Sequence, residues 1–152
     1  MRPRLAIGIG CRKGCSGENI ASLVRQALAL AARSDKTVGG TRAQQESVMF
    51  TSEAKGGEPG VTEAAAALGM NLVFLPRAEL EAASSRCATR SARVQRLIGL
   101  PSLAEAAALA GAGEGSRLVL ERISGGGASC ALAAPLAAPL AVPLAMPAER
   151  AS

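Results

Sequence analysis

The chain has 152 residues, near the size of one domain, and 49% of them are apolar, which is enough for one hydrophobic core. Its formal net charge is +5, and 14 of its 17 basic residues are arginine, whose planar guanidinium suits carboxylates and phosphates. Phe50 and Phe74 are the only aromatic residues, which argues against a nucleic-acid partner because single strands are bound largely by aromatic stacking.

The chain contains no histidine, which removes the commonest general base and most patterns of metal ligands. We therefore predict neither a metal nor another cofactor. Its four cysteines are Cys11, Cys15, Cys87 and Cys130. They are too few and too scattered for a disulfide framework, so we expect reduced thiols in the cytoplasm.

The two ends of the sequence bear on membrane insertion and export. The N-terminal segment lacks the apolar length of a signal peptide. The uncharged stretch 130–148 has the length of a membrane span, but proline recurs at every fourth position from Pro135 to Pro147. A spanning helix would tolerate these prolines poorly, so we expect no membrane partner.

The first third of the chain predicts a strand, a loop, a helix and a second strand. The apolar run Leu5 to Gly10 predicts a buried strand, followed by a tight loop from Cys11 to Gly17. Apolar residues then recur at helical spacing and predict a helix with one buried face: Ile20, Leu23, Val24, Ala27, Leu28 and Ala31. The polar segment 33–46 predicts an exposed connection, and Val48 to Phe50 predicts the second strand.

The middle of the chain continues this alternation. Pro59 suits the first turn of a helix that ends near Gly69, where glycine favours a left-handed C-terminal cap. The segment 71–75 predicts a third strand, and 77–83 predicts one or two helical turns. The segment 84–96 is polar and basic.

Another helix is predicted after position 101. Ser102 and Glu105 stand three residues apart before an alanine-rich run, which is a capping-box pattern. We expect this helix to run to about Ala110 and to be stopped by Gly111 and Gly113.

The segment 118–133 predicts a hairpin. Leu118 to Leu120 forms one strand, Gly125 to Gly127 the turn, and Ala128 to Ala133 the second strand. Alternating strands and helices predict an α/β fold, a single three-layer domain with a mixed, mostly parallel sheet flanked by helices. We expect this domain to span residues 1–134, and residues 135–152 to be a disordered, low-complexity tail of proline, leucine and alanine.

The loop after the first strand leads to a helix N-terminus, where backbone amides favour a bound anion. Its candidate ligand-binding residues are Gly10, Cys11, Arg12, Lys13, Gly14 and Ser16. Its glycine spacing matches neither the dinucleotide fingerprint nor a phosphate loop, so a nucleotide-binding regulatory module is only an alternative. Glycines that serve a tight turn and nothing else are another alternative.

A second loop follows the second strand, at the same sheet edge if the two strands are parallel. Here Thr51, Lys55 and Glu58 are candidate ligand-binding residues. Glu53 and Glu58 are also candidate catalytic residues, because a carboxylate could orient a ligand or activate a water. Solvated loop carboxylates are the simpler interpretation.

Two further segments are candidates for ligand contact. In the hairpin turn these are Ser124, Gly125 and Gly126. A basic run could clamp acidic groups of a ligand or could be a solvated surface: Arg86, Arg90, Arg93 and Arg96.

Three sequence blocks together resemble a known family. Gly8-Ile-Gly-Cys-Arg-Lys-Gly14 is similar to the opening motif of the family formed by CobE and the C-terminal domain of CbiG. Lys55-Gly-Gly-Glu-Pro-Gly60 resembles its lysine, glutamate, proline and glycine loop, and Gly99-Leu-Pro-Ser-Leu-Ala-Glu-Ala-Ala-Ala-Leu109 resembles its glutamate-alanine-alanine helix. The order and spacing of the blocks also match, and the resemblance covers about residues 4 to 133.

This resemblance implies a role in making the corrin ring of cobalamin. CbiG proteins open a lactone of a cobalt-precorrin, so a precorrin lactone hydrolase is one alternative, and whether this chain is an enzyme stays open. The preferred interpretation is a standalone CobE-type protein that binds or hands over carboxylate-rich corrin or precorrin intermediates. Its expected partners are such an intermediate and other enzymes of the cobalamin pathway.

Overall fold

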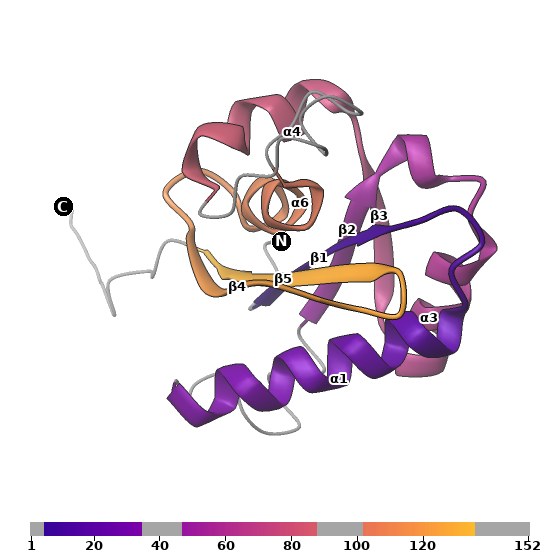
Figure 1. The fold of residues 1–152 in the computed structure, drawn as a ribbon. Helices are drawn as coiled ribbons and strands as arrows, with labels where there is room; N and C mark the ends of the chain where they lie inside the picture. Colours follow the sequence, from indigo (N-terminus) through magenta and orange to yellow (C-terminus); the bar gives the residue numbers. More distant parts are fainter. Residues whose placement is uncertain (1–4, 35–46, 88–101, 136–152) are drawn as a thin grey trace, which may run out of the picture.

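The structure, a computed structural model, describes residues 5–34, 47–87 and 102–135 (Figure 1). Its strands are β1 (Leu5–Cys11), β2 (Ser47–Ser52), β3 (Asn71–Leu75), β4 (Arg117–Gly125) and β5 (Ala128–Ala134). Its α-helices are α1 (Gly17–Ser34), α3 (Pro59–Leu68), α4 (Arg77–Ala83) and α6 (Leu103–Ala112), and two short 3-10 helices are η1 (Glu53–Lys55) and η2 (Ser84–Arg86).

The five strands form one sheet in the order β3-β2-β1-β5-β4. β1 pairs in parallel with β2, and β2 in parallel with β3, whereas β5 is antiparallel to both of its neighbours. Four strands therefore run in one direction and β5 runs against them. This arrangement confirms the predicted α/β class with a mixed, mostly parallel sheet, and it confirms the hairpin.

Helices cover both faces of the sheet and make three layers (Figure 1). One core cluster joins α1 and α3 to one face, and a second joins α4 and α6 to the other. Side chains of β1 alternate between the two faces, so Ile7 and Ile9 pack in the first cluster and Ala6 in the second. β1 is thus the central strand of the domain.

The helix α1 confirms the apolar stripe predicted from the sequence. Its buried residues recur at helical spacing, and Leu28 packs partly buried beside them: Ile20, Leu23, Val24, Ala27 and Ala31. The cap at the end of α3 is also confirmed, since Gly69 has a φ of 67° and its amide bonds back to the helix. The third strand has the predicted bounds.

The helix α6 lies unusually close to the sheet because small residues meet at the contact. A Cβ atom at Gly8 would overlap the backbone oxygen of Ala104 and the backbone nitrogen of Ala108. The alanines of α6 other than Ala110 are buried, and their small side chains allow this backbone approach. A hydrogen atom at position 8 is therefore a requirement of the fold.

The predicted end of α6 is confirmed at Gly113 and wrong at Gly111. The helix continues through Gly111 to Ala112 and ends at Gly113, where φ is 97°. Instead, Gly111 makes room for Phe50 of β2, because a Cβ atom there would overlap the phenyl ring. This glycine serves helix-sheet packing and not helix termination.

A buried carboxylate connects α6 to β4. Ser102 caps the helix as predicted, since its Oγ accepts from the amide of Glu105 at 3.3 Å. The Glu105 side chain is fully buried, and its Oε2 accepts from the amide of Arg122 at 2.9 Å. The pairing of β4 with β5 shifts register between Leu120 and Ile123. Glu105 thus satisfies a backbone donor in the irregular part of β4.

Some predictions fall outside the described residues. The segment 33–46, the stretch 84–96 and the tail 135–152 lie mostly beyond them. Within the described ranges, no helix is both long enough and apolar enough to cross a membrane.

The contact at Gly8 can be tested by adding one methyl group. We expect Gly8→Ala to lower the free energy of unfolding by about 3 kcal/mol, because the methyl group meets backbone atoms that cannot turn aside. Gly57→Ala is the matched control, since nothing lies within 4 Å of a Cβ atom there. Urea unfolding measures both, and a loss at Gly8 no larger than at Gly57 would contradict the packing.

The carboxylate of Glu105 gives a second test. Glu105→Ala removes a fully buried side chain and leaves the partly buried Arg122 amide without this acceptor, so we expect a loss of about 3 kcal/mol in urea unfolding. Glu79 is exposed on α4, and Glu79→Ala is the control, with an expected change within about 0.5 kcal/mol. Equal effects of the two substitutions would show that Glu105 does not stabilise β4.

Candidate functional site

Three segments meet at the edge of the sheet where β1 and β2 end. They are the loop 11–16, which begins at the last residue of β1, the loop 53–58 after β2, and the hairpin turn 125–127, which begins at the last residue of β4. The hairpin turn lies beside the first loop because β5 pairs with β1, and the amide of Arg12 donates to the carbonyl of Gly127 at 2.9 Å. The structure therefore brings together the segments in which the sequence predicted ligand contacts.

The first loop is tied to the hairpin turn by side chains as well. The thiol of Cys15 donates to the carbonyl of Gly126 at 3.2 Å, and Asn19 Nδ2 donates to the same oxygen at 3.4 Å. Gly126 and Gly127 have φ values of 62° and 84°, which glycine adopts without strain. Asn19 was not predicted from the sequence, where it is only a polar residue between Glu18 and Ile20 near the expected start of the helix.

Glu58 ties the first loop to the second. Its Oε1 accepts from the amide of Gly14 at 2.8 Å. The starts of α1 and α3 also touch, because a Cβ atom at Gly17 would lie 2.6 Å from Cβ of Glu63 and one at Gly60 would overlap the carbonyl of Cys15. The two helices therefore begin side by side, with Glu58 directly before α3.

Three of the candidate residues have structural contacts. Thr51 is fully buried, and its hydroxyl donates to the carbonyl of Ile9 at 2.7 Å. Ser16 Oγ accepts from the amide of Asn19 at 3.1 Å in the first turn of α1. Gly10 is buried and faces Leu103 of α6. These three residues contact neighbouring parts of the protein at this edge of the sheet. Their role as ligand contacts stays a prediction.

The charged candidates differ in exposure. Arg12, Lys13 and Glu53 are exposed, whereas Lys55 and Glu58 are half-buried. In the part of the chain that the structure describes, Arg12 and Lys13 form neither an ion pair nor a side-chain hydrogen bond. Two cations are thus free to meet an anionic ligand at this edge.

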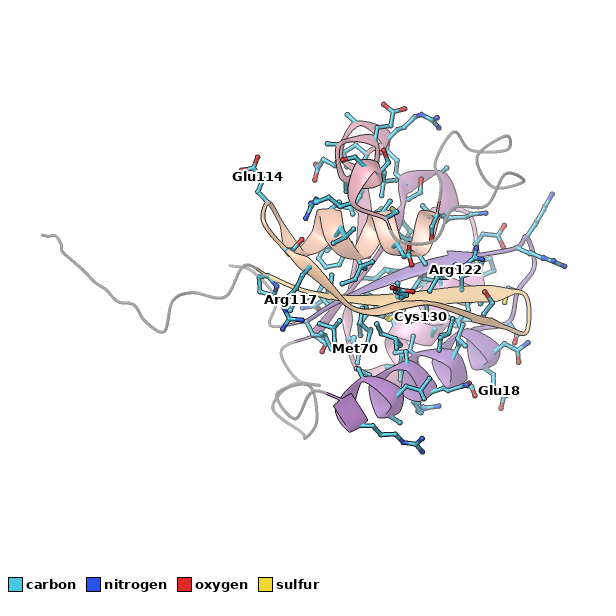
Figure 2. All side chains as sticks on the ribbon, turned by 60° about the vertical axis from the view of Figure 1, so that its left-hand side comes forward. Glu18, Met70, Glu114, Arg117, Arg122 and Cys130 are labelled. Atoms are coloured by element: carbon cyan, nitrogen blue, oxygen red, sulfur yellow. The ribbon has the colours of Figure 1, made fainter. Side chains whose placement is uncertain are left out.

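The thiols at the site are neutral near pH 7. Burial raises the pKa of Cys11; Lys55 lowers it, and Cys15 and Glu58 raise it. Burial and then the charge of Glu58 raise the pKa of Cys15. In β5, complete burial raises the pKa of Cys130 to about 12 (Figure 2). Among the described residues, no three potential metal-ligating cysteine or carboxylate side chains gather.

The remaining candidates lie at two different places. Ser124 and Ser129 face each other across the hairpin, with their hydroxyl oxygens 3.4 Å apart. Arg86 donates from Nη1 to the carbonyl of Ser116 at 2.8 Å and to its hydroxyl at 3.0 Å. Ser116 precedes β4, so Arg86 lies at the opposite end of that strand from the hairpin turn. The other arginines of the basic run are outside the described residues.

Comparison with known proteins gives a consistent result. Residues 5–133 match the family model described as "Cobalamin synthesis G C-terminus". The chain is 32% identical over 131 residues to Protein CobE from Sinorhizobium sp., and the match covers 86% of this chain and 80% of that protein.

Solved structures agree with the sequence match. CobE, described as a protein from the cobalamin (vitamin B12) biosynthetic pathway, is 34% identical with a TM-score of 0.73, over 88% of this chain and 92% of that chain. Cobalamin biosynthesis protein chiG from Agrobacterium tumefaciens str. C58 is 30% identical with a TM-score of 0.57, over 86% of this chain and 98% of that chain. The family model spans nearly all of the described residues, and these relatives agree with it. The chain therefore belongs to the cobalamin synthesis G C-terminal family, which confirms the family expected from the sequence, that of CobE and the C-terminal domain of CbiG.

Proposed function

We propose that this protein acts in cobalamin biosynthesis as a CobE-type protein that binds and hands over carboxylate-rich corrin or precorrin intermediates. The relatives supply the pathway, since CobE and chiG are named for it. The loops at the carboxyl edge of the sheet supply the binding site. Other enzymes of the pathway would then deliver the intermediate or take it over.

The observation that carries the proposal is the free pair of cations on the first loop. Arg12 and Lys13 are exposed and unpaired within the described residues, on a loop that hydrogen bonds hold to the hairpin turn and to Glu58. Corrin intermediates carry acetate and propionate groups around the ring, and guanidinium and ammonium groups form charge-assisted hydrogen bonds with carboxylates. A loop that is already ordered loses less entropy when it binds.

The two alternatives have less support at this edge. A lactone hydrolase would need a carboxylate placed to activate water, and one oxygen of Glu58 is already engaged with the Gly14 amide, which leaves only the other oxygen for that role. Glu53 is exposed and stays an untested catalytic candidate. A nucleotide-binding module would bind phosphate with the loop amides. Here the Gly14 amide donates to the Glu58 carboxylate, and the Arg12 amide donates to the carbonyl of Gly127.

The proposal predicts that the side chains of Arg12 and Lys13 contribute to affinity and not to stability. Titration with hydrogenobyrinic acid, followed by its absorbance, should show saturable binding. The double variant Arg12→Ala/Lys13→Ala should bind about tenfold more weakly, which corresponds to about 1.4 kcal/mol. Its melting temperature should stay level or rise slightly, because positive charge near a helix N-terminus is unfavourable without a bound anion.

A matched control separates local contacts from net charge. Arg25→Ala/Arg33→Ala also removes two exposed positive charges, but from positions further along α1. We expect it to change affinity by less than about twofold at moderate salt, where exposed charges beyond a Debye length are screened. Equal weakening in both double variants would make the effect one of net charge, and unchanged binding by the Arg12 and Lys13 variant would place the ligand elsewhere.

A further inference from the structure

In the structure, one backbone amide of the loop 11–16 that was expected to bind an anion already has a partner within the protein. The backbone amides of this loop were expected to hold an anion, because the loop leads into the N-terminus of α1. Instead, the Gly14 amide donates to Glu58 Oε1 at 2.8 Å, so a protein carboxylate already uses this donor. Gly14 has a φ of 80°, a conformation that favours glycine.

The position of Glu58 on its own helix supports this assignment. Glu58 precedes α3 at the N-cap position, but its side chain makes no capping hydrogen bond there. Pro59 follows at the first helical position, which has no amide to satisfy. The carboxylate is thus free of its own helix and crosses to the loop before α1.

Electrostatics favour a negative charge at this place. The starts of α1 and α3 touch near Gly17 and Gly60, and both helix dipoles present their positive ends there. The charge of Glu58 reaches both neighbouring thiols: it raises the pKa of Cys15 second only to burial, and it raises the pKa of Cys11 after the larger effects of burial, Lys55 and Cys15. Glu58 therefore acts as an internal anion for the loop.

We infer that Glu58 is the positioning and specificity residue of the corrin site. Its carboxylate fixes the loop through the Gly14 amide, and it excludes ligand carboxylates from that amide. The acid groups of the ligand then meet the exposed side chains of Arg12 and Lys13 and not the Gly14 amide. This inference rests on the proposed function.

Two substitutions at Glu58 separate its hydrogen bond from its charge. Glu58→Gln keeps an oxygen that accepts from the Gly14 amide but removes the negative charge, so affinity for hydrogenobyrinic acid should rise at least about threefold. Glu58→Ala removes the same charge and also the acceptor, so the loosened loop should bind at least about fivefold more weakly than the original protein. Opposite signs for the two variants are the expected result.

A matched control tests the charge alone. Glu18 is an exposed carboxylate in the first turn of α1, two residues after Ser16 (Figure 2). Glu18→Gln should change affinity by less than about twofold, since a solvated charge is screened. Equal gains in Glu18→Gln and Glu58→Gln would overturn the specificity role, as would weaker binding by Glu58→Gln.

A ligand-free measurement tests the positioning role by itself. In a Cys11→Ser background, the rate of Cys15 alkylation by iodoacetamide is followed from about pH 7 to about pH 11, because the pKa of this thiol is raised above its ordinary value. Both Glu58 variants should show a lower thiol pKa than the original protein, because the neighbouring negative charge is gone. Only Glu58→Ala should also show a faster limiting rate at high pH, because only there is the loop released. Cys87 and Cys130 are buried and should react slowly.

The two readouts distinguish the possible failures. If the original protein binds no corrin acid, the proposed function and the specificity role both fail, and the alkylation rates still decide whether Glu58 fixes the loop. If corrin binding is found but the limiting alkylation rates of the two variants are equal, the positioning role is overturned while the proposed function stands.

Discussion

The contact between the backbone of α6 and Gly8 of β1 is the constraint on which the domain depends. β1 is the central strand, and a side chain at position 8 would collide with Ala104 and Ala108. With α6 at this distance, its buried Glu105 reaches the amide of Arg122 in β4. One close approach thus connects the centre of the sheet to its outer strand.

The order of the strands then builds the candidate site. Because β5 inserts between β1 and β4, the hairpin turn lies beside the loop that follows β1. The carbonyl oxygens of Gly126 and Gly127 accept from Cys15, Asn19 and Arg12, which hold the first loop in place. The parallel pairing of β1 and β2 brings the second loop, with Glu58, to the same edge.

The charges at this edge are divided between an inner anion and outer cations. Cys11 and Cys15 remain neutral near pH 7, because burial raises the pKa of both thiols. Glu58 lies at the helix starts, whereas Arg12 and Lys13 extend from the loop into solvent. The proposed ligand, with acid groups around its rim, would meet the outer cations, while the inner carboxylate of Glu58 accepts from the Gly14 amide of the loop.

Local features of the fold were predictable because they depend on neighbouring residues. The apolar stripe of α1, the left-handed cap at Gly69 and the Ser102 cap of α6 each follow from spacing within a few positions. The three family blocks also indicate the correct family, because their joint order and spacing are specific even though each block alone is short. The sequence further indicated which loops would carry polar and charged residues.

The amino-acid sequence by itself determined the type and order of the elements, since periodicity and capping act within one element. Tertiary structure alone decided that Gly111 lies inside α6 against Phe50 and that the Gly14 amide is taken by Glu58. These partners are far apart in the chain, 44 residues in the case of Gly14 and Glu58. Such contacts depend on how close two packed elements approach, which no local pattern specifies.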